Sequence, residues 1–149
     1  DYEGKDVLMV GLLKGSVPFF AELAKHVTLV VEFDFMRVSS YEGTESTGNV
    51  IVKKDIDVDF KGKDILLVED ILDTGKTLYT VRQMLLEKGA ASVEIATLLN
   101  KQERREFPIQ AKYVGFEIPN AFVIGYGMDY NEKYRNLPYV GILKEEVYM

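Results

Sequence analysis

Short apolar blocks alternate along this chain with polar segments and with helical patterns. Blocks rich in Val, Ile, Leu and Phe are typical of strands, and they lie at 7–13, 28–37, 50–54, 65–68, 93–99, 113–116, 121–125 and 140–143. Two segments with apolar residues at helical spacing lie at 17–24 and 76–88, and Gly89 ends the second. Strands that alternate with helices predict an α/β fold with a mainly parallel sheet.

The apolar block at 65–68 is followed directly by acidic residues. Ile65-Leu66-Leu67-Val68 has the pattern of a strand buried on both faces, and Glu69, Asp70 and Asp73 come next. Thr74-Gly75-Lys76-Thr77 then opens the helical segment. Ligands of open α/β sheets bind at the carboxyl ends of the strands, and a helix N-terminus suits a phosphate. We therefore expect a phosphorylated sugar with magnesium at this turn.

Gly75-Lys76-Thr77 also invites comparison with the ATP-binding P-loop. That motif has a glycine five positions before its Gly-Lys-Thr, and here the position is Asp70, whose charge would face the triphosphate. The sequence therefore excludes a P-loop. An ordinary strand–turn–helix connection with solvated acids is the remaining alternative.

A second turn suited to anions follows the first predicted strand. Lys14-Gly15-Ser16 precedes the helical segment that begins with Val17-Pro18. Taken alone, it fits a plain strand–helix turn. Two such turns at strand ends, one of them with carboxylates, favour a single ligand with two anionic groups.

The segment 39–49 is polar, contains glycine and lacks apolar periodicity. It is longer than most connections in a compact domain. Such a loop is either a lid or binding loop, or an exposed hairpin tip. From the residues alone, both interpretations stay open.

Composition narrows the functional class. A chain of 149 residues that is 47% hydrophobic can bury one core, and without cysteine it has neither disulfides nor thiolate chemistry. No apolar stretch approaches the roughly 18 residues of a membrane span. The net charge of −6, from 18 basic and 24 acidic residues, argues against broad nucleic-acid binding. We expect a cytoplasmic protein without nucleic-acid or membrane partners.

Together these motifs resemble the type I phosphoribosyltransferases, and more narrowly the hypoxanthine (hypoxanthine-guanine) phosphoribosyltransferases. The segment 68–77 is similar to the family's signature for phosphoribosyl pyrophosphate, and 13–16 to its pyrophosphate loop. Ser40-Tyr41 and the polar residues after it resemble its mobile active-site loop, and 114–132 resembles the 6-oxopurine branch. The resemblance covers nearly the whole chain.

That resemblance implies a mainly parallel central sheet flanked by helices, with a small hood region and a mobile active-site loop. Residues 1–149 would form a single phosphoribosyltransferase domain. In the family a helical segment precedes the first strand, and we expect that N-terminal segment to be missing from this chain. The family also implies a homodimer or homotetramer.

The implied reaction belongs to purine salvage. It is a Mg2+-dependent transfer of the 5-phosphoribosyl group from phosphoribosyl pyrophosphate to N9 of hypoxanthine or guanine, giving IMP or GMP and pyrophosphate. Asp73 would be the catalytic proton acceptor, close to the purine N7. An ammonium has only donors, so Lys101 would suit the 6-oxo group and reject adenine.

The resemblance assigns the other site residues by the group they hold. Ribose hydroxyls and metal fall to Glu69 and Asp70, with Asp129 near a second metal. The 5′-phosphate falls to Asp73, Thr74, Gly75, Lys76 and Thr77, and the pyrophosphate to Lys14, Gly15, Ser16 and Arg135. The purine falls to Lys101, Phe122, Val123 and Asp129, and the lid is Ser40 and Tyr41.

Two rival functions remain. Some proteins of this fold sense ligand while binding RNA or DNA, but they should carry a basic face, whereas this chain is acidic and keeps Lys101, Phe122 and Asp129. An enzyme for another oxopurine such as xanthine is the second rival, because Lys101 suits that oxo group equally.

Overall fold

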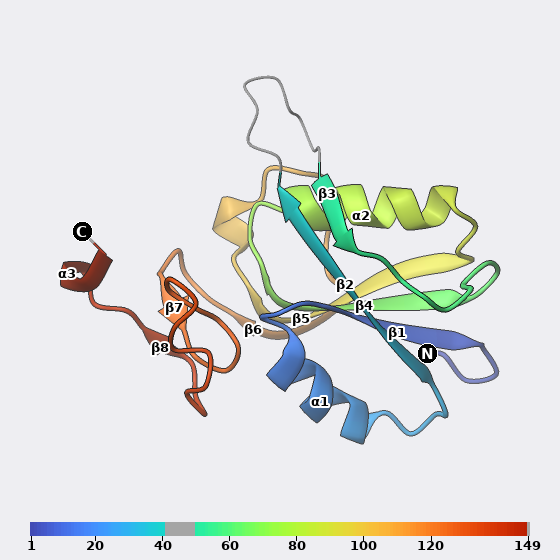
Figure 1. Cartoon of the computed structure of the whole chain (residues 1–149), viewed down its shortest axis with the longest axis horizontal. Helices are drawn as coiled ribbons and strands as arrows, with labels where there is room; N and C mark the ends of the chain where they lie inside the picture. Colours follow the sequence, from blue (N-terminus) through green and yellow to red (C-terminus); the bar gives the residue numbers. More distant parts are fainter. Residues whose placement is uncertain (41–49, 149) are drawn as a thin grey trace.

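A six-stranded sheet forms the centre of the molecule (Figure 1). The computed structural model describes residues 1–40 and 50–148. The strands lie in the order β3-β2-β1-β4-β5-β6, and all neighbours are parallel except β2 and β3. Their bounds are β1 Val7–Leu12, β2 Glu32–Ser40, β3 Val50–Lys54, β4 Asp64–Leu72, β5 Ser92–Asn100 and β6 Tyr113–Glu117. The predicted α/β fold with a mainly parallel sheet is confirmed.

Helices α1 (Val17–His26) and α2 (Lys76–Glu87) cover opposite faces of this sheet. Side chains alternate between the faces along a strand, so Leu8 and Val10 of β1 pack with α2 while Met9 packs with Phe20 of α1. All six residues of β1 are buried. This explains why β1 carries no polar side chain.

The C-terminal segment lies beside the main sheet (Figure 1, orange to red). It contains the short antiparallel pair β7 (Val123–Ile124) and β8 (Gly141–Ile142), followed by α3 (Glu145–Tyr148). The predicted strands 121–125 and 140–143 are therefore real but shorter. A 3-10 turn, η1 (Gln102–Arg104), follows β5. Within the described residues, no helix is both long enough and apolar enough to cross a membrane.

Two predicted boundaries at the sheet edge are wrong. Strand β4 does not stop at Val68, because Glu69 and Ile71 keep pairing with β5, so the first two carboxylates lie within the strand. Strand β2 begins at Glu32 and continues to Ser40, which pairs with Val50. Backbone pairing with a neighbouring strand extended both strands into sequence that the hydrophobic pattern marks as polar.

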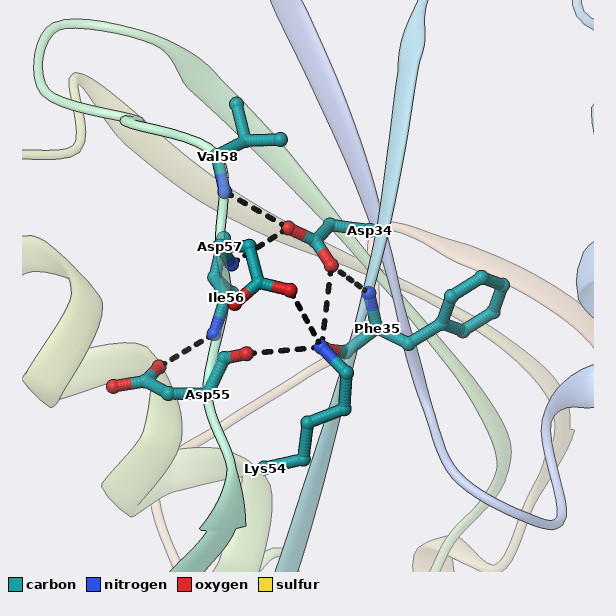
Figure 2. A network of polar contacts seen from close by, with 7 residues as sticks. All are labelled: Asp34, Phe35, Lys54, Asp55, Ile56, Asp57 and Val58. Atoms are coloured by element: carbon teal, nitrogen blue, oxygen red, sulfur yellow. Dashed lines mark hydrogen bonds and ion pairs between the residues drawn. The ribbon is translucent and has the colours of Figure 1, made fainter.

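Asp34 of β2 ties this strand to the segment after β3 (Figure 2). Its carboxylate accepts hydrogen bonds from the backbone N–H groups of Phe35, Asp57 and Val58 at 2.7, 2.8 and 3.0 Å. Lys54 Nζ lies 3.5 Å from the same carboxylate. Burial alone would raise the pKa of Asp34, but the three N–H groups and Lys54 together lower it. Asp34 is therefore a buried anion that fixes the β2–β3 edge.

Candidate active site

Two adjoining cavities lie at the carboxyl ends of β1 and β4. The first, about 290 Å3, is lined by Lys14, Gly15, Arg135 and every residue from 69 to 78. The second, about 550 Å3, is lined by Lys101, Phe122, Val123 and Asp129 among others. Asp70, Ile71 and Asp73 line both cavities. The fold thus gathers the residues of the predicted phosphate turn, pyrophosphate turn and base site around one shared wall.

Glu69 and Asp70 are adjacent carboxylates at the end of β4. Glu69 accepts the N–H of Asp70 at 2.9 Å, and Asp70 accepts that of Ile71 at 2.7 Å. Burial and the neighbouring charge of Asp70 raise the pKa of Glu69 well above its ordinary value. The Asp70 carboxylate lies against Gly15, where a Cβ would clash with it. The pyrophosphate turn is therefore in direct contact with the carboxyl end of β4, which leads into the phosphate turn, and a side chain at position 15 would crowd that contact.

The turn before α2 has the geometry expected of a phosphate site. Gly75 caps the helix in the left-handed region, with φ of 88°, and a Cβ there would lie 2.6 Å from Ile109 Cγ2. Thr74 Oγ1 accepts the N–H of Lys76 at 3.3 Å. Because residues 73–78 line the first cavity, the N-terminus of α2 faces it, and the helix dipole favours an anion there.

Two arginines from the segment after β5 hold Asp73. Arg104 Nε donates to the Asp73 carboxylate at 3.0 Å, and Arg105 Nε donates to its backbone oxygen at 3.0 Å. Arg105 also donates to Ile109 O at 3.0 Å and to the side chain of Asn100. Burial lowers the pKa of Arg105. Arg104 was not predicted as a site residue, because it belongs to no motif. The only signal in the sequence is that it stands three positions after Lys101, at the end of a predicted strand.

The second cavity contains the predicted base-reading residues. Lys101 is buried, and its backbone N–H donates to Leu72 O at 2.9 Å. Phe122 is 38% exposed and packs edge-on against Tyr130, with ring centroids 5.8 Å apart. Val123 starts β7. A largely buried lysine and a partly exposed aromatic ring that line the same cavity can hold a flat ring that carries an oxo group.

Lys14 and Arg135 meet at one carboxylate, that of Glu132. Lys14 Nζ and Arg135 Nη2 each lie 2.8 Å from it, and Arg135 Nη1 donates to Gly127 O at 2.7 Å. Hydrogen bonds from Lys14 and Arg135 lower the pKa of Glu132 to about 2. Asp129 accepts the Glu132 N–H at 2.8 Å and lies 3.6 Å from Arg135. Glu132 was also missed, although it stands within the segment 114–132.

The pyrophosphate turn carries two further features. The Leu13–Lys14 peptide bond is cis. Ser16 Oγ and Arg135 Nε are buried without a hydrogen-bond partner among the described residues, and buried polar atoms normally have one.

Some predicted residues are not brought into these cavities. Ser16 is fully buried beneath the turn. The Ser40 side chain and Tyr41, predicted as the lid, lie outside the described residues. In the ranges 1–40 and 50–148, no three acidic or histidine side chains lie close enough to hold a metal by themselves.

Comparison with known proteins identifies the family of this chain. A family model described as phosphoribosyl transferase domain matches residues 1–131. The hypoxanthine-guanine phosphoribosyltransferase of Streptococcus pneumoniae R6 is 58% identical over 149 residues, which is 99% of this chain and 83% of that protein.

Solved structures agree with it. The crystal structure of a hypoxanthine phosphoribosyltransferase from Staphylococcus aureus superposes with a TM-score of 0.96 at 52% identity, covering 100% of this chain and 82% of that one. A Trypanosoma cruzi hypoxanthine phosphoribosyl transferase, studied for the role of its C-terminal region in oligomeric state and activity, gives a TM-score of 0.91 at 39% identity over 98% and 77% of the two chains.

Proposed function

This chain belongs to the phosphoribosyltransferase family, and we propose from its two cavities which residues carry out each part of the reaction. Its relatives place it among the hypoxanthine-guanine phosphoribosyltransferases, so it transfers a 5-phosphoribosyl group to a 6-oxopurine in purine salvage. One observation carries the assignment of roles: Asp70 and Asp73 line both the phosphate cavity and the base cavity. A sugar bound between the cavities would bring its C1 to the base.

Donor binding falls to the first cavity. The N-terminus of α2 with Thr74, Gly75, Lys76 and Thr77 holds the 5′-phosphate, and Glu69 and Asp70 accept from the ribose hydroxyls. Lys14, Gly15, Ser16 and Arg135 hold the pyrophosphate in this proposal. Lys14, Gly15 and Arg135 line the first cavity, whereas Ser16 is fully buried in this structure and would become available only if the turn moved. Backbone dipoles and a few local cations replace the favourable net charge that this acidic chain lacks.

The protein offers magnesium two adjacent carboxylates, and substrate oxygens and water would complete its coordination. Mg2+ typically keeps several waters and takes one or two carboxylates together with substrate oxygens. Glu69 and Asp70 are such a pair. Burial and the neighbouring charge of Asp70 raise the pKa of Glu69, and a cation would offset the repulsion between the two carboxylates. Asp129 lines the other cavity and would serve a second metal. When bound, the metal would neutralise charge on the pyrophosphate.

Asp73 is the proton acceptor in this proposal. It stands on the shared wall and its carboxylate is 39% exposed, so it can reach a purine nitrogen. The ion pair with Arg104 at 3.0 Å fixes the orientation of this carboxylate. Arg105 fixes the backbone of the same residue. A base held in this way is ready to take a proton as C1 bonds to N9.

Lys101 reads the base in this proposal. Its ammonium donates to the 6-oxo group, Phe122 stacks on the ring, and the Val123 backbone meets the ring edge. The 6-amino group of adenine would face a donor with another donor. Ser40 and Tyr41 would cover the site, and we further propose a cytoplasmic homodimer or homotetramer of one domain, residues 1–149.

Calorimetric titration with IMP, GMP and AMP in the presence of Mg2+ tests this assignment of cavities. IMP and GMP should bind at least ~10²-fold more tightly than AMP, because buried donors left unpaired by the wrong ligand are costly. Equal affinity for AMP would show that Lys101 does not read the base. Lys25→Met, which removes an exposed lysine of α1, is the matched control for Lys101→Met.

A further inference from the structure

Two cations at the pyrophosphate turn share a single carboxylate. Glu132 Oε1 accepts from Lys14 Nζ at 2.8 Å, and Glu132 Oε2 accepts from Arg135 Nη2 at 2.8 Å. Each oxygen of one anionic group thus takes one cation, as two oxygens of a phosphate group would. Lys14 and Arg135 line the first cavity, whereas Glu132, which contacts both, is not among its lining residues.

The backbone holds Glu132 in this position. Its N–H donates to Asp129 Oδ2 at 2.8 Å, and Tyr130 and Lys133 exchange two backbone hydrogen bonds of 3.0 Å across the turn. Asn131 and Glu132 both have positive φ values, 52° and 64°. Residues with side chains seldom adopt this conformation, and it clusters at functional sites. Glu132 is therefore placed by a defined turn and is not a loosely solvated acid.

Pyrophosphate and the Glu132 carboxylate need the same donors. We propose that Glu132 is an internal competitor for Lys14 and Arg135, and that it sets how weakly the pyrophosphate group binds and how readily it leaves. The inference rests on the proposed function, which assigns these two cations to pyrophosphate. A negative charge in contact with both cations also lowers the local positive potential that attracts an incoming anion.

The competition affects only ligands that carry a pyrophosphate group. It acts on free pyrophosphate and on the phosphoribosyl donor, which carries the same group. It leaves a nucleotide monophosphate unaffected, because the 5′-phosphate binds at 73–77 on the turn before α2. Since both ion pairs are partly exposed, each is weak and screened by salt. We expect a modest effect of 2- to 10-fold, strongest at low ionic strength.

The test is calorimetric titration of Mg2+-pyrophosphate into the whole chain and into Glu132→Gln at low salt. Glu132→Gln should bind pyrophosphate ~2- to 10-fold more tightly than the unaltered chain, with IMP affinity unchanged. Glu146→Gln, on α3, removes the same charge away from these cations and should leave both affinities unchanged. Glu132→Ala, which also removes the charge, should act in the same direction.

Two results would overturn the inference. Weaker pyrophosphate binding by Glu132→Gln would make Glu132 a clamp that aligns the two cations, and an unchanged affinity would mean that its ion pairs do not compete. A failure of the unaltered chain to bind pyrophosphate would instead contradict the proposed function. Unchanged IMP affinity in the variant shows that the fold and the 5′-phosphate site are intact.

Discussion

Acidic side chains in this molecule take different roles because their surroundings differ. Asp34 is buried with three backbone N–H groups, and its pKa is lowered. Glu69 is buried beside Asp70, and its pKa is raised. Asp73 stands at the shared wall of two cavities and pairs with Arg104. The first environment suits structure, the second suits a cation, and the third suits proton transfer.

Asp73→Asn tests the proton acceptor. The amide keeps the shape of the side chain but cannot take a proton, so turnover should fall by ~10²–10⁴. Donor affinity should survive, because the substitution leaves the backbone N–H groups of the phosphate turn (73–77) and the whole pyrophosphate turn in place. Steady-state kinetics with a donor titration measures both quantities. Asp6→Asn, before β1 at the opposite edge of the sheet, is the control, and full turnover in Asp73→Asn would remove this residue from the mechanism.

Gly15→Ala tests the contact between the two anion turns. The added Cβ would clash with the Asp70 carboxylate, so either the Asp70 side chain or the pyrophosphate turn must shift, and overpacking of this kind costs about 1–3 kcal/mol. We expect donor affinity to fall by roughly 5- to 100-fold, measured by calorimetry. Gly141→Ala, where the nearest atom to a Cβ is 3.6 Å away, should bind normally. Undiminished affinity in Gly15→Ala would show that the contact is not needed.

At the scale of elements, the hydrophobic pattern predicted which strands and helices exist better than where they end. The central strands are apolar because both faces are covered, and that signal is local. The extension of β4 through Glu69 to Leu72 depends on pairing with β5, a neighbour that the pattern of 65–68 does not contain. The extension of β2 to Ser40 depends in the same way on β3.

The same distinction applies to the candidate site. Lys14, Asp73 and Lys101 could be found because each follows a predicted strand and matches a motif. Arg104 and Glu132 could not, since their roles arise from contacts between segments that are distant in the sequence. The Arg104–Asp73 pair joins residues 31 positions apart, and the Lys14–Glu132 pair joins residues 118 positions apart.

Asp34→Asn tests the β2–β3 edge through its pH dependence. The folded-state pKa of Asp34 is lowered, so its stabilisation is complete above the ordinary carboxylate value of about 4 and is lost as pH falls through the folded-state pKa. At pH 7 the variant should lose about 1–3 kcal/mol of unfolding free energy. The difference from the unaltered chain should shrink in acid.

Urea unfolding at neutral pH and in acid measures this difference. Asp59→Asn changes an exposed acid of the same connection between β3 and β4, whose carboxylate accepts a 3.2 Å hydrogen bond from the Lys61 N–H. This variant should stay within about 0.5 kcal/mol of the unaltered chain at both pH values. A difference for Asp34→Asn that is independent of pH would contradict the role of its charge.

At the scale of the whole molecule, the net charge of −6 does not attract an anionic ligand, so local groups at the carboxyl edge of the parallel sheet must hold it. The first cavity concentrates a helix N-terminus, Lys14 and Arg135 at one edge of the sheet. The second places a buried Lys101 beside an aromatic ring. Group transfer needs both cavities, because the first binds the donor and the second binds the base. The residues that line both, Asp70, Ile71 and Asp73, join them into one active site.

The most direct test is nucleotide formation from phosphoribosyl pyrophosphate and Mg2+, followed spectrophotometrically with hypoxanthine, guanine, xanthine and adenine in parallel. We predict turnover with hypoxanthine and guanine and none with adenine, and the xanthine rate will define the branch. Turnover with adenine, or no turnover with any base while the donor still binds, would contradict the account.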